Sequence, residues 1–396
     1  MVRLAIAISH PIQYHAPLYG YLARDSRFDL HVFYMSDRGA RAYFEPFAQT
    51  MVSFDNPILA GYEHTFLSRG EPQSWLAKKT EMMQFGLRDA LAKWKPEAVY
   101  FHGYTNPAFL RAMSWCRANG VAVWMRGENE DVLPRPPWRN VAREAFLRRL
   151  IPKIDAFLYI GRENHDFFIR RGVSPSKLFY VPYSVDNHYF AGGIDETERE
   201  RIRNVLRERY ALASEARVFI YTHKFRDTMR PLDAVQGFGR ASSRFTRPAA
   251  LIMCGSGELK AAIEQMASSY ANARVILPGF LKQSELREHL LGSDVMINPA
   301  IEPWGCSVNE GIASALAQIS SSMVVGWPDM VREKNGLVYE AGDLDALAND
   351  IAKLAAISDD ELRAMQNESL RLAREELSFA KCADGLADAA AATVKR

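Results

Sequence analysis

Short apolar segments of strand length alternate with helical patterns along most of the sequence. The first segment, residues 4–8, precedes a polar loop and a helical pattern at residues 18–24. Later apolar segments are followed by further helical patterns, at residues 107–119, 138–151 and 162–171. Strands that are buried on both faces and alternate with helices form parallel sheets. The alternation therefore predicts an α/β fold with a doubly wound sheet in the first half.

The alternation starts again in the second half, after a highly charged helical pattern at residues 192–210 that is expected to be solvated. A chain of 396 residues is too long for one ordinary core. We therefore expect two Rossmann-like domains, residues 1–188 and 189–377, whose carboxyl strand ends face an interdomain cleft. Residues 378–396 are predicted to form a C-terminal helix that packs back on the first domain, because their apolar side chains form one stripe.

Charge and cysteine usage exclude several classes of protein. The formal net charge is +2, from 49 basic and 47 acidic residues, so no charge excess indicates a nucleic-acid partner. The four cysteines have neither CxxC nor zinc-ligand spacing. No apolar run reaches the roughly 18 residues that span a bilayer. We expect a cytoplasmic protein, in which the basic helix at residues 139–153 is a candidate for peripheral membrane contact or else an ordinary solvated helix.

The stretch EPWGCSVNEG carries two carboxylates, Glu302 and Glu310. Glu302 precedes Pro303 and Gly305, which do not suit a helix interior, whereas Glu310 lies within the first turns of a helical pattern. A helix N-terminus favours an anion such as a diphosphate, and a nearby carboxylate can accept both hydroxyl protons of a ribose. The stretch therefore predicts a nucleotide site, with two solvated acids at a helix start as the alternative.

Five sequence motifs follow one another in order between about residues 218 and 354. They are YTHKFRDTMRPLDAVQGF, LIMCGSGELK, VILPGFL, SDVMINPAIEPWGCSVNEGIASAL and PDMVREKNGLVYEAGDLDALANDI. In this order they resemble glycosyltransferase family 4, the retaining group with the GT-B fold and an E-x7-E pair. The first half resembles the family more loosely, through HPIQYHAPLY, MRGENE and GVSPSKLFYVPYSVDNHYF.

The resemblance implies a nucleotide-sugar site around the E-x7-E pair. Glu310 matches the acid that holds the ribose hydroxyls, and Glu302 matches the acid that faces the donor sugar. Backbone N–H groups between the two acids would line the sugar and the phosphate, at Trp304, Gly305 and Cys306.

The resemblance also implies a basic pair for the leaving diphosphate, where preorganised positive groups stabilise the developing charge. Lys224 matches the first basic position, and Met229 stands at the second. Arg230, next to Met229, is the candidate replacement. Lys224, Arg230 and Glu302 are therefore the candidate catalytic residues, with a solvated basic loop as the alternative for the two cations.

Three further residues fall at donor-binding positions of the family. Gly255 lies in a tight turn, and Phe280 and Leu281 stand where the family places residues against the base. Backbone geometry for the glycine and ordinary core packing for the other two are the alternatives. Ala315 and Ala317 replace the usual Gly and Pro, and a left-handed Ala315 would cost about 1–2 kcal/mol.

Polar residues at the strand ends of the first domain are candidates for acceptor or cleft contacts. His10 and His15 flank the loop after the first strand, and His102 ends a later strand. Arg126 and Glu128 follow the next strand, where an arginine can supply charge or orientation but accept no proton. A satisfied structural role is the alternative for each histidine.

No other catalytic motif competes with this interpretation. Asp343 and Asp345 form a DxD sequence, but they follow Gly342 at the start of a helical pattern, so we expect an N-cap rather than a metal site. The sequence has no Walker A, HExxH or GxSxG motif, and no GxGxxG follows the first strand. Neither a metal nor another cofactor is therefore expected.

The sequence thus predicts a retaining, metal-independent glycosyltransferase of two doubly wound domains. It would move a hexose-type sugar from a nucleoside diphosphate, UDP being favoured over GDP, to a saccharide, a lipid-linked or a small-molecule acceptor. A role in the synthesis of bacterial surface polysaccharides or glycoconjugates would fit. The departures at Met229 and Ala315 keep a non-catalytic protein that binds nucleotide sugars or a partner as an alternative, and a nucleotide-sugar epimerase as a third possibility.

Overall fold

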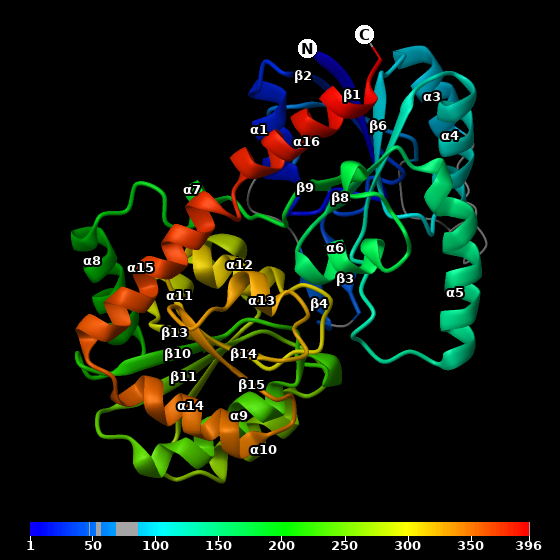
Figure 1. Ribbon diagram of the computed structural model, residues 1–396. Coiled ribbons are helices and arrows are strands. Elements are labelled where there is room, and N and C mark those ends of the chain that lie inside the picture. Colours follow the sequence, from blue (N-terminus) through cyan, green and yellow to red (C-terminus); the bar gives the residue numbers. More distant parts are fainter. Residues whose placement is uncertain (47, 53–56, 69–85, 396) are drawn as a thin grey trace. The chain divides into compact units, whose positions relative to one another are not determined.

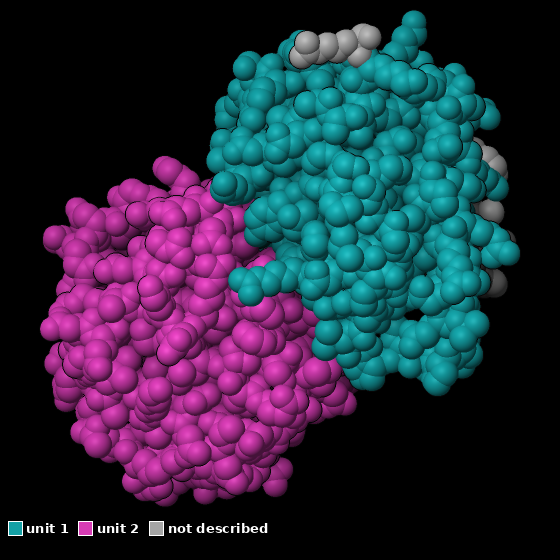
Figure 2. Space-filling view, in the orientation of Figure 1, with its two compact units in different colours: residues 1–43, 56–183, 379–396 teal, residues 44–55, 184–378 magenta. Residues whose placement is uncertain are grey.

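The computed structural model describes residues 1–46, 48–52, 57–68 and 86–395. The chain divides into two compact units, shown in two colours in Figure 2. Unit 1 comprises Met1–Tyr43, Asn56–Tyr183 and Phe379–Arg396, and unit 2 comprises Phe44–Asp55 and Ser184–Ser378. Each unit has its own parallel sheet, so the prediction of two doubly wound α/β domains is confirmed.

The sheet of unit 1 has seven parallel strands in the order β5-β2-β1-β6-β7-β8-β9. In chain order, the strands are β1 Val2–Ile8, β2 Phe28–Tyr34, β5 Glu63–Phe66, β6 Ala98–His102, β7 Ala122–Arg126, β8 Ala156–Tyr159 and β9 Leu178–Tyr180. The strand order reverses between β1 and β6, where Leu4 pairs with Ala98. In an open parallel sheet, ligands bind at the carboxyl ends of the strands on either side of such a reversal.

Helices cover both faces of this sheet (Figure 1). They are α1 Ala16–Arg24, α3 Gly86–Trp94, α4 Pro107–Ala118, α5 Pro137–Leu150, α6 Arg162–Ile169 and α16 Phe379–Thr393. Successive residues of β1 alternate between two apolar clusters, because side chains of a strand point to opposite faces. The sequence also has a helical pattern at about residues 75–94; α3 accounts for residues 86–94, and residues 75–85 lie outside the described residues.

The C-terminal helix α16 belongs to unit 1. It packs on β8, β9 and α1, and its Cys382 and Leu386 are fully buried. Near its end, Thr393 Oγ1 accepts a hydrogen bond of 2.8 Å from the indole Nε1 of Trp124. The apolar stripe read from the sequence is therefore the face that covers this side of the sheet.

The sheet of unit 2 has six parallel strands in the order β12-β11-β10-β13-β14-β15. The strands are β10 Arg217–Tyr221, β11 Ala249–Cys254, β12 Arg274–Gly279, β13 Val295–Asn298, β14 Ala317–Ser321 and β15 Gly336–Tyr339. Numbered from β10, this order is 3-2-1-4-5-6, the order of the dinucleotide-binding Rossmann fold. Its reversal lies between β10 and β13.

The helices of unit 2 complete the α/β layers (Figure 1). They are α7 Asn187–Phe190, α8 Glu196–Arg209, α9 Pro231–Ala241, α10 Lys260–Ser268, α11 Gln283–Gly292, α12 Cys306–Ala313, α13 Trp327–Met330, α14 Leu344–Ala356 and α15 Asp359–Glu375. Strands β3 Tyr43–Glu45 and β4 Thr50–Val52 form a separate two-stranded sheet. Within the described residues, no helix is both long and apolar enough to cross a membrane.

The charged helix α8 is less solvated than its composition predicts. Arg199, Arg203 and Arg207 are buried, because they share one helix face and reach polar groups of neighbouring segments. Arg207 donates to Asp294 Oδ2 at 3.2 Å, and Arg199 donates to the carbonyl oxygen of Ala315 at 3.0 Å. Composition alone cannot separate such a face from a solvated one.

Candidate functional site

The strand-order reversal of unit 2 brings two candidate loops together. The loop after β10 carries Lys224 and Arg230, and the loop after β13 carries Glu302. A backbone hydrogen bond of 2.8 Å from Ile301 to the carbonyl oxygen of Thr228 joins the two loops directly. Segments more than seventy residues apart in the sequence therefore present their side chains at one end of the sheet.

Glu302 is fixed at this end by both its backbone and its side chain. Its N–H donates to the carbonyl oxygen of Met323 at 3.1 Å, and its own carbonyl accepts from Val325 at 2.9 Å. Its carboxylate Oε1 accepts a hydrogen bond of 3.1 Å from Nδ2 of Asn298, the last residue of β13. The carboxylate is thus held at the strand end rather than free in solvent.

His223 is the basic residue seen beside Glu302, and the sequence interpretation did not single it out. Its Nε2 lies 2.9 Å from Ser307 Oγ and 3.9 Å from Glu302 Oε1. Burial lowers the pKa of the imidazole, and the positive charge of Arg226 lowers it further, while Glu302 acts in the opposite direction. The ring is therefore neutral near pH 7. Its place directly before Lys224 in the loop after β10 is the sequence signal that could have identified it.

Lys224 and Arg230 both have acidic partners. Lys224 Nζ lies 3.3 Å from Glu45 Oε1, and Arg230 Nε donates to Asp233 Oδ2 at 2.7 Å. Arg230 has a φ of 47°, in the left-handed region, and directly precedes α9. Met229 lies in the preceding 3₁₀ turn, and its carbonyl accepts a hydrogen bond from Tyr221.

Tight packing brings the loop onto helix α12. Gly305 has a φ of 113°, and a Cβ at this position would lie 2.7 Å from a methyl carbon of Val324, so only glycine fits. Trp304 is buried, and its indole N–H donates to Asn309 Oδ1 at 2.7 Å. Cys306 is the first residue of α12. The three residues predicted to line the sugar and phosphate are therefore held rigidly around one helix start.

Glu310 lies one turn into α12 and is only 3% exposed. Burial raises the pKa of its carboxyl group to about 8. Its Oε1 has no hydrogen-bond partner among the residues that the structure describes. A buried carboxyl oxygen without a donor is costly, and a ligand that brings hydroxyl donors would remove that cost.

The turn after β11 packs against the loop after β10. A Cβ on Gly255 would lie 2.1 Å from the carbonyl oxygen of His223, so the glycine permits a close approach of two backbones. Phe225 N–H donates to the carbonyl oxygen of Ser256 at 2.9 Å in the same contact. After β12, Phe280 is exposed and Leu281 is half-buried, so the structure places neither in the core.

Four of the five candidates in unit 1 form one connected cluster beside its own strand-order reversal. The rings of His15 and His102 lie 4.6 Å apart, and burial lowers the pKa of both well below the usual value. Arg126 lies over the ring of Tyr183, whose hydroxyl donates to Glu128 Oε1 at 2.6 Å.

Further hydrogen bonds join this cluster to neighbouring tyrosines. Arg126 donates to the hydroxyl of Tyr100 at 3.0 Å, and His102 Nε2 lies 2.8 Å from the hydroxyl of Tyr19. His10, the fifth candidate, is half-buried, and its Nδ1 lies 2.9 Å from Ser9 Oγ. Through these contacts His102 and Arg126 stabilise the local structure of unit 1.

Two local predictions concern helix ends. Asp343 caps α14, because its side chain accepts from the N–H of Ala346 at 2.9 Å, so the expected N-cap is confirmed. Ala315, after α12, has a φ of 57°, which is the left-handed conformation considered for it.

Among the described residues, no three His, Cys, Asp or Glu side chains group in a way that could hold a metal ion.

The comparisons with known proteins agree with this geometry. Residues 202–371 match the family Glycosyl transferases group 1. No curated protein matches the sequence. A glycosyltransferase structure from Rickettsia africae has 11% identity and a TM-score of 0.69, over 99% of this chain and 98% of its own.

Two further solved structures are similar over nearly their whole length. HepE from Anabaena, in complex with UDP-glucose, has 10% identity and a TM-score of 0.68, over 99% of this chain and 100% of its own. The lipopolysaccharide outer core galactosyltransferase WaaB has 14% identity and a TM-score of 0.65, over 97% and 99%. Residues 202–371 are therefore similar to the glycosyl transferases group 1 domain, and the chain has the two-domain α/β fold of these glycosyltransferase structures.

Proposed function

We propose that the protein is a retaining, metal-independent glycosyltransferase of the family 4 type. It transfers a hexose-type sugar from a nucleoside diphosphate, with UDP favoured over GDP, to a saccharide, lipid-linked or small-molecule acceptor. The observation that carries the proposal is Glu310, a buried carboxyl group inside the matched domain, one oxygen of which has no hydrogen-bond partner among the described residues. Two vicinal hydroxyl groups of a ribose are donors of the kind that this oxygen lacks.

The donor diphosphate would lie at the start of α12. Helix α12 begins at Cys306, directly after Gly305, and a helix N-terminus favours an anion. Glu302, fixed by Asn298, would face the sugar. HepE, which has the same fold, was solved with UDP-glucose, and this supports UDP as the first nucleotide to test.

In the proposed reaction, the bond between the anomeric carbon and the β-phosphate oxygen breaks, and its electron pair goes to the diphosphate. The acceptor oxygen bonds to the anomeric carbon on the face that the diphosphate leaves, and its proton passes to a β-phosphate oxygen. Lys224 and Arg230 would stabilise the negative charge that develops on the diphosphate. His223, a neutral imidazole beside Glu302, would fix the relative positions of the Ser307 hydroxyl and the Glu302 carboxylate.

The acceptor would contact unit 1 through the cluster of His15, His102, Arg126 and Glu128. WaaB is a lipopolysaccharide galactosyltransferase of similar fold, so bacterial surface saccharides are the acceptors to test first. Neutral imidazoles and a carboxylate are hydrogen-bond acceptors for sugar hydroxyl groups. This part of the proposal rests on the side chains that unit 1 gathers at its own strand ends.

The test combines binding and turnover. Thermal unfolding is measured with a panel of nucleotides and nucleotide sugars, and donor consumption is measured with the sugars that stabilise the protein. Glu310→Ala is expected to lower turnover by about 100-fold or more, a typical loss for one preorganised polar group. Glu333→Ala, which removes an exposed acid of the same domain, is the control. Unchanged turnover in Glu310→Ala would refute the donor site.

One observation favours a second candidate function. Lys224 and Arg230 are both engaged by carboxylates, so a protein that binds a nucleotide sugar without transferring it is the alternative. It would be stabilised by UDP or GDP and would consume no donor. An epimerase would instead convert free donor without any acceptor, and chromatography of the nucleotide sugar distinguishes the two.

A further inference from the structure

Helix α5 of unit 1 has an outward face that combines apolar and basic side chains. Trp138 is 67% exposed and Val141 is 71% exposed. Residues three, four and seven positions apart share a helix face, so Ala142 and Ala145 lie beside them. Both alanines are also exposed. We name this set, together with the cations described next, the α5 outer face.

Cations flank the apolar residues of the α5 outer face. Arg148 and Arg149 lie ten and eleven positions after Trp138, on the same side of the helix, and both are exposed. Arg139 is exposed too, and its guanidinium lies over the Trp138 ring at 5.1 Å. Lys153 continues the set just beyond the helix. Glu144 is the one acid in the sequence of α5.

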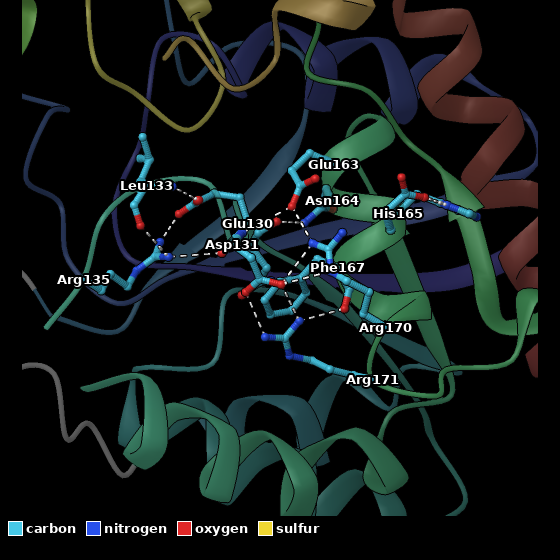
Figure 3. Close-up of polar contacts among 12 residues, drawn as sticks. Glu130, Asp131, Leu133, Arg135, Glu163, Asn164, His165, Phe167, Arg170 and Arg171 are labelled. Carbon is cyan, nitrogen blue, oxygen red and sulfur yellow. Dashed lines mark hydrogen bonds and ion pairs between the residues drawn. The ribbon is translucent and has the colours of Figure 1, made fainter. Parts of the chain in front are cut away.

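Acids near α5 are engaged by arginines, and Figure 3 shows Asp131 beside Arg170 and Arg171. Glu144 pairs with Arg171, and Asp131 accepts hydrogen bonds from Arg143, Arg170 and Arg171. The hydrogen bonds and positive charges of Arg171 and Arg170 outweigh the cost of burial and lower the pKa of Asp131 to about 2, so the carboxyl group stays ionised.

The inner side of α5 also contributes to the core. Leu147 and Leu150 are buried in the apolar cluster that covers one face of the sheet. Glu130 forms a further ion pair with Arg135 in the loop that precedes the helix. The helix therefore cannot rotate its apolar outer residues inward without breaking these contacts, and the charge that remains outside is positive.

A single exposed tryptophan would need no explanation, because isolated apolar residues are common on protein surfaces. The exposed residues here are not isolated. Of the ten large hydrophobic side chains that are exposed in the described parts of the chain, four lie between residues 132 and 146: Val132, Trp138, Val141 and Phe146. The concentration on one helix and its leading loop indicates a surface that contacts something.

We propose that the α5 outer face docks on the surface of an anionic phospholipid bilayer, with the helix lying parallel to the membrane plane. Tryptophan prefers the headgroup region, where its ring is apolar and its N–H stays hydrated. Arginine side chains add attraction to anionic headgroups while their stems cover apolar surface. A helix with apolar and cationic residues on one exposed face is suited to this environment.

Charge argues against a second copy of the chain as the occupant. A symmetric pairing through this face would bring Arg139, Arg148 and Arg149 of one copy against the same residues of the other. Like charges at such a contact repel each other, and no acid of the α5 outer face offsets them. The anionic bilayer supplies the opposite charge over the whole face. This inference does not depend on the proposed catalytic function.

Flotation of the full-length protein with vesicles tests the proposal. Phosphatidylcholine vesicles with phosphatidylglycerol should carry the protein upward at low salt, and vesicles of phosphatidylcholine alone should carry much less. Arg148→Glu combined with Arg149→Glu should lower the partition coefficient by at least about 25-fold, since each cation near an anionic surface contributes roughly fivefold. Trp138→Ser combined with Val141→Ser should also lower it, although all cations remain.

A matched control changes the same charge elsewhere in unit 1. Arg111→Glu combined with Arg117→Glu alters two exposed arginines of α4 and should leave vesicle binding close to that of the wild type. No binding of the wild type to the anionic vesicles would overturn the proposal, as would equal losses in the α4 and α5 charge variants. A dimer in solution that Trp138→Ser dissociates would assign the face to a second copy instead.

Discussion

Lys224 Nζ lies 3.3 Å from Glu45 Oε1, so the cation assigned to the leaving diphosphate already has a carboxylate partner within unit 2. A diphosphate would compete with Glu45 for this cation. Glu45→Gln should therefore lower the Kd for UDP, by up to about fivefold, because a part-exposed ion pair contributes at most about 1 kcal/mol. Isothermal titration calorimetry measures the change. Glu264→Gln, on α10, removes an equal charge as the control, and a Kd that neither Glu45→Gln nor Lys224→Met alters would exclude Lys224 from the phosphate site.

His223 is expected to position the Ser307 hydroxyl and the Glu302 carboxylate rather than to carry a charge. Burial keeps its imidazole neutral near pH 7. An uncharged side chain that can still form hydrogen bonds should therefore take over part of its positioning role. His223→Gln is expected to retain most of the kcat, whereas His223→Ala should lose about tenfold or more with a smaller change in KM. Steady-state kinetics on both variants distinguishes the cases. Equal losses in the two would show that the ring itself, or its protonated form, is required.

Glu310 should make the stability of the nucleotide-free protein depend on pH in an unusual direction. Its pKa is raised from 4.5 to about 8 by burial, so between these values the folded state binds more protons than the unfolded state. The free energy of unfolding therefore falls as the pH rises through this window. Glu310→Gln lacks this loss and should become more stable than the wild type, by a few kcal/mol at pH 9. Urea unfolding at pH 5 and pH 9 measures the gap, and a gap independent of pH would contradict the assignment.

Ala315 occupies a left-handed backbone conformation with a φ of 57°. Ala315→Gly should stabilise the protein by about 1 kcal/mol, because glycine adopts this conformation without the steric cost. Ala142→Gly, in the exposed middle of α5, should instead destabilise it by about 1 kcal/mol. Chemical denaturation of the two variants provides the comparison. A loss of stability in Ala315→Gly would mean that packing of the Ala315 methyl group stabilises the fold by more than the left-handed backbone destabilises it.

The sequence predicted the fold because hydrophobic alternation and helix signals reflect local backbone preferences. Strand β1 lies at the first apolar segment and Asp343 caps its helix as expected, but strands β5 and β14 were not predicted. The assignment to family 4 and the role of its E-x7-E pair stay predictions. The buried arginines of α8 were misjudged as solvated, because their partners, such as Asp294, lie far away in the sequence.

The site was predictable only in part. Glu302 and Glu310 stood out because two acids flank one helix start. His223 did not, since its contact with Ser307 depends on how two loops cross at the strand-order reversal. The pairing of Lys224 with Glu45 joins segments that no local pattern connects. Loop crossings and long-range ion pairs are set by the packing of whole elements, and a linear motif does not encode them.

Unit 1 is interrupted in the chain, since its second segment ends at Tyr183 and its last helix starts at Phe379. On the ribosome, the apolar surface of β8 and β9 stays uncovered until α16 has been synthesised. Unit 2, contained between Ser184 and Ser378 apart from residues 44–55, can fold first. The nascent first half is therefore exposed to aggregation for as long as translation of the second half takes, which makes it the part of the molecule most in need of a chaperone.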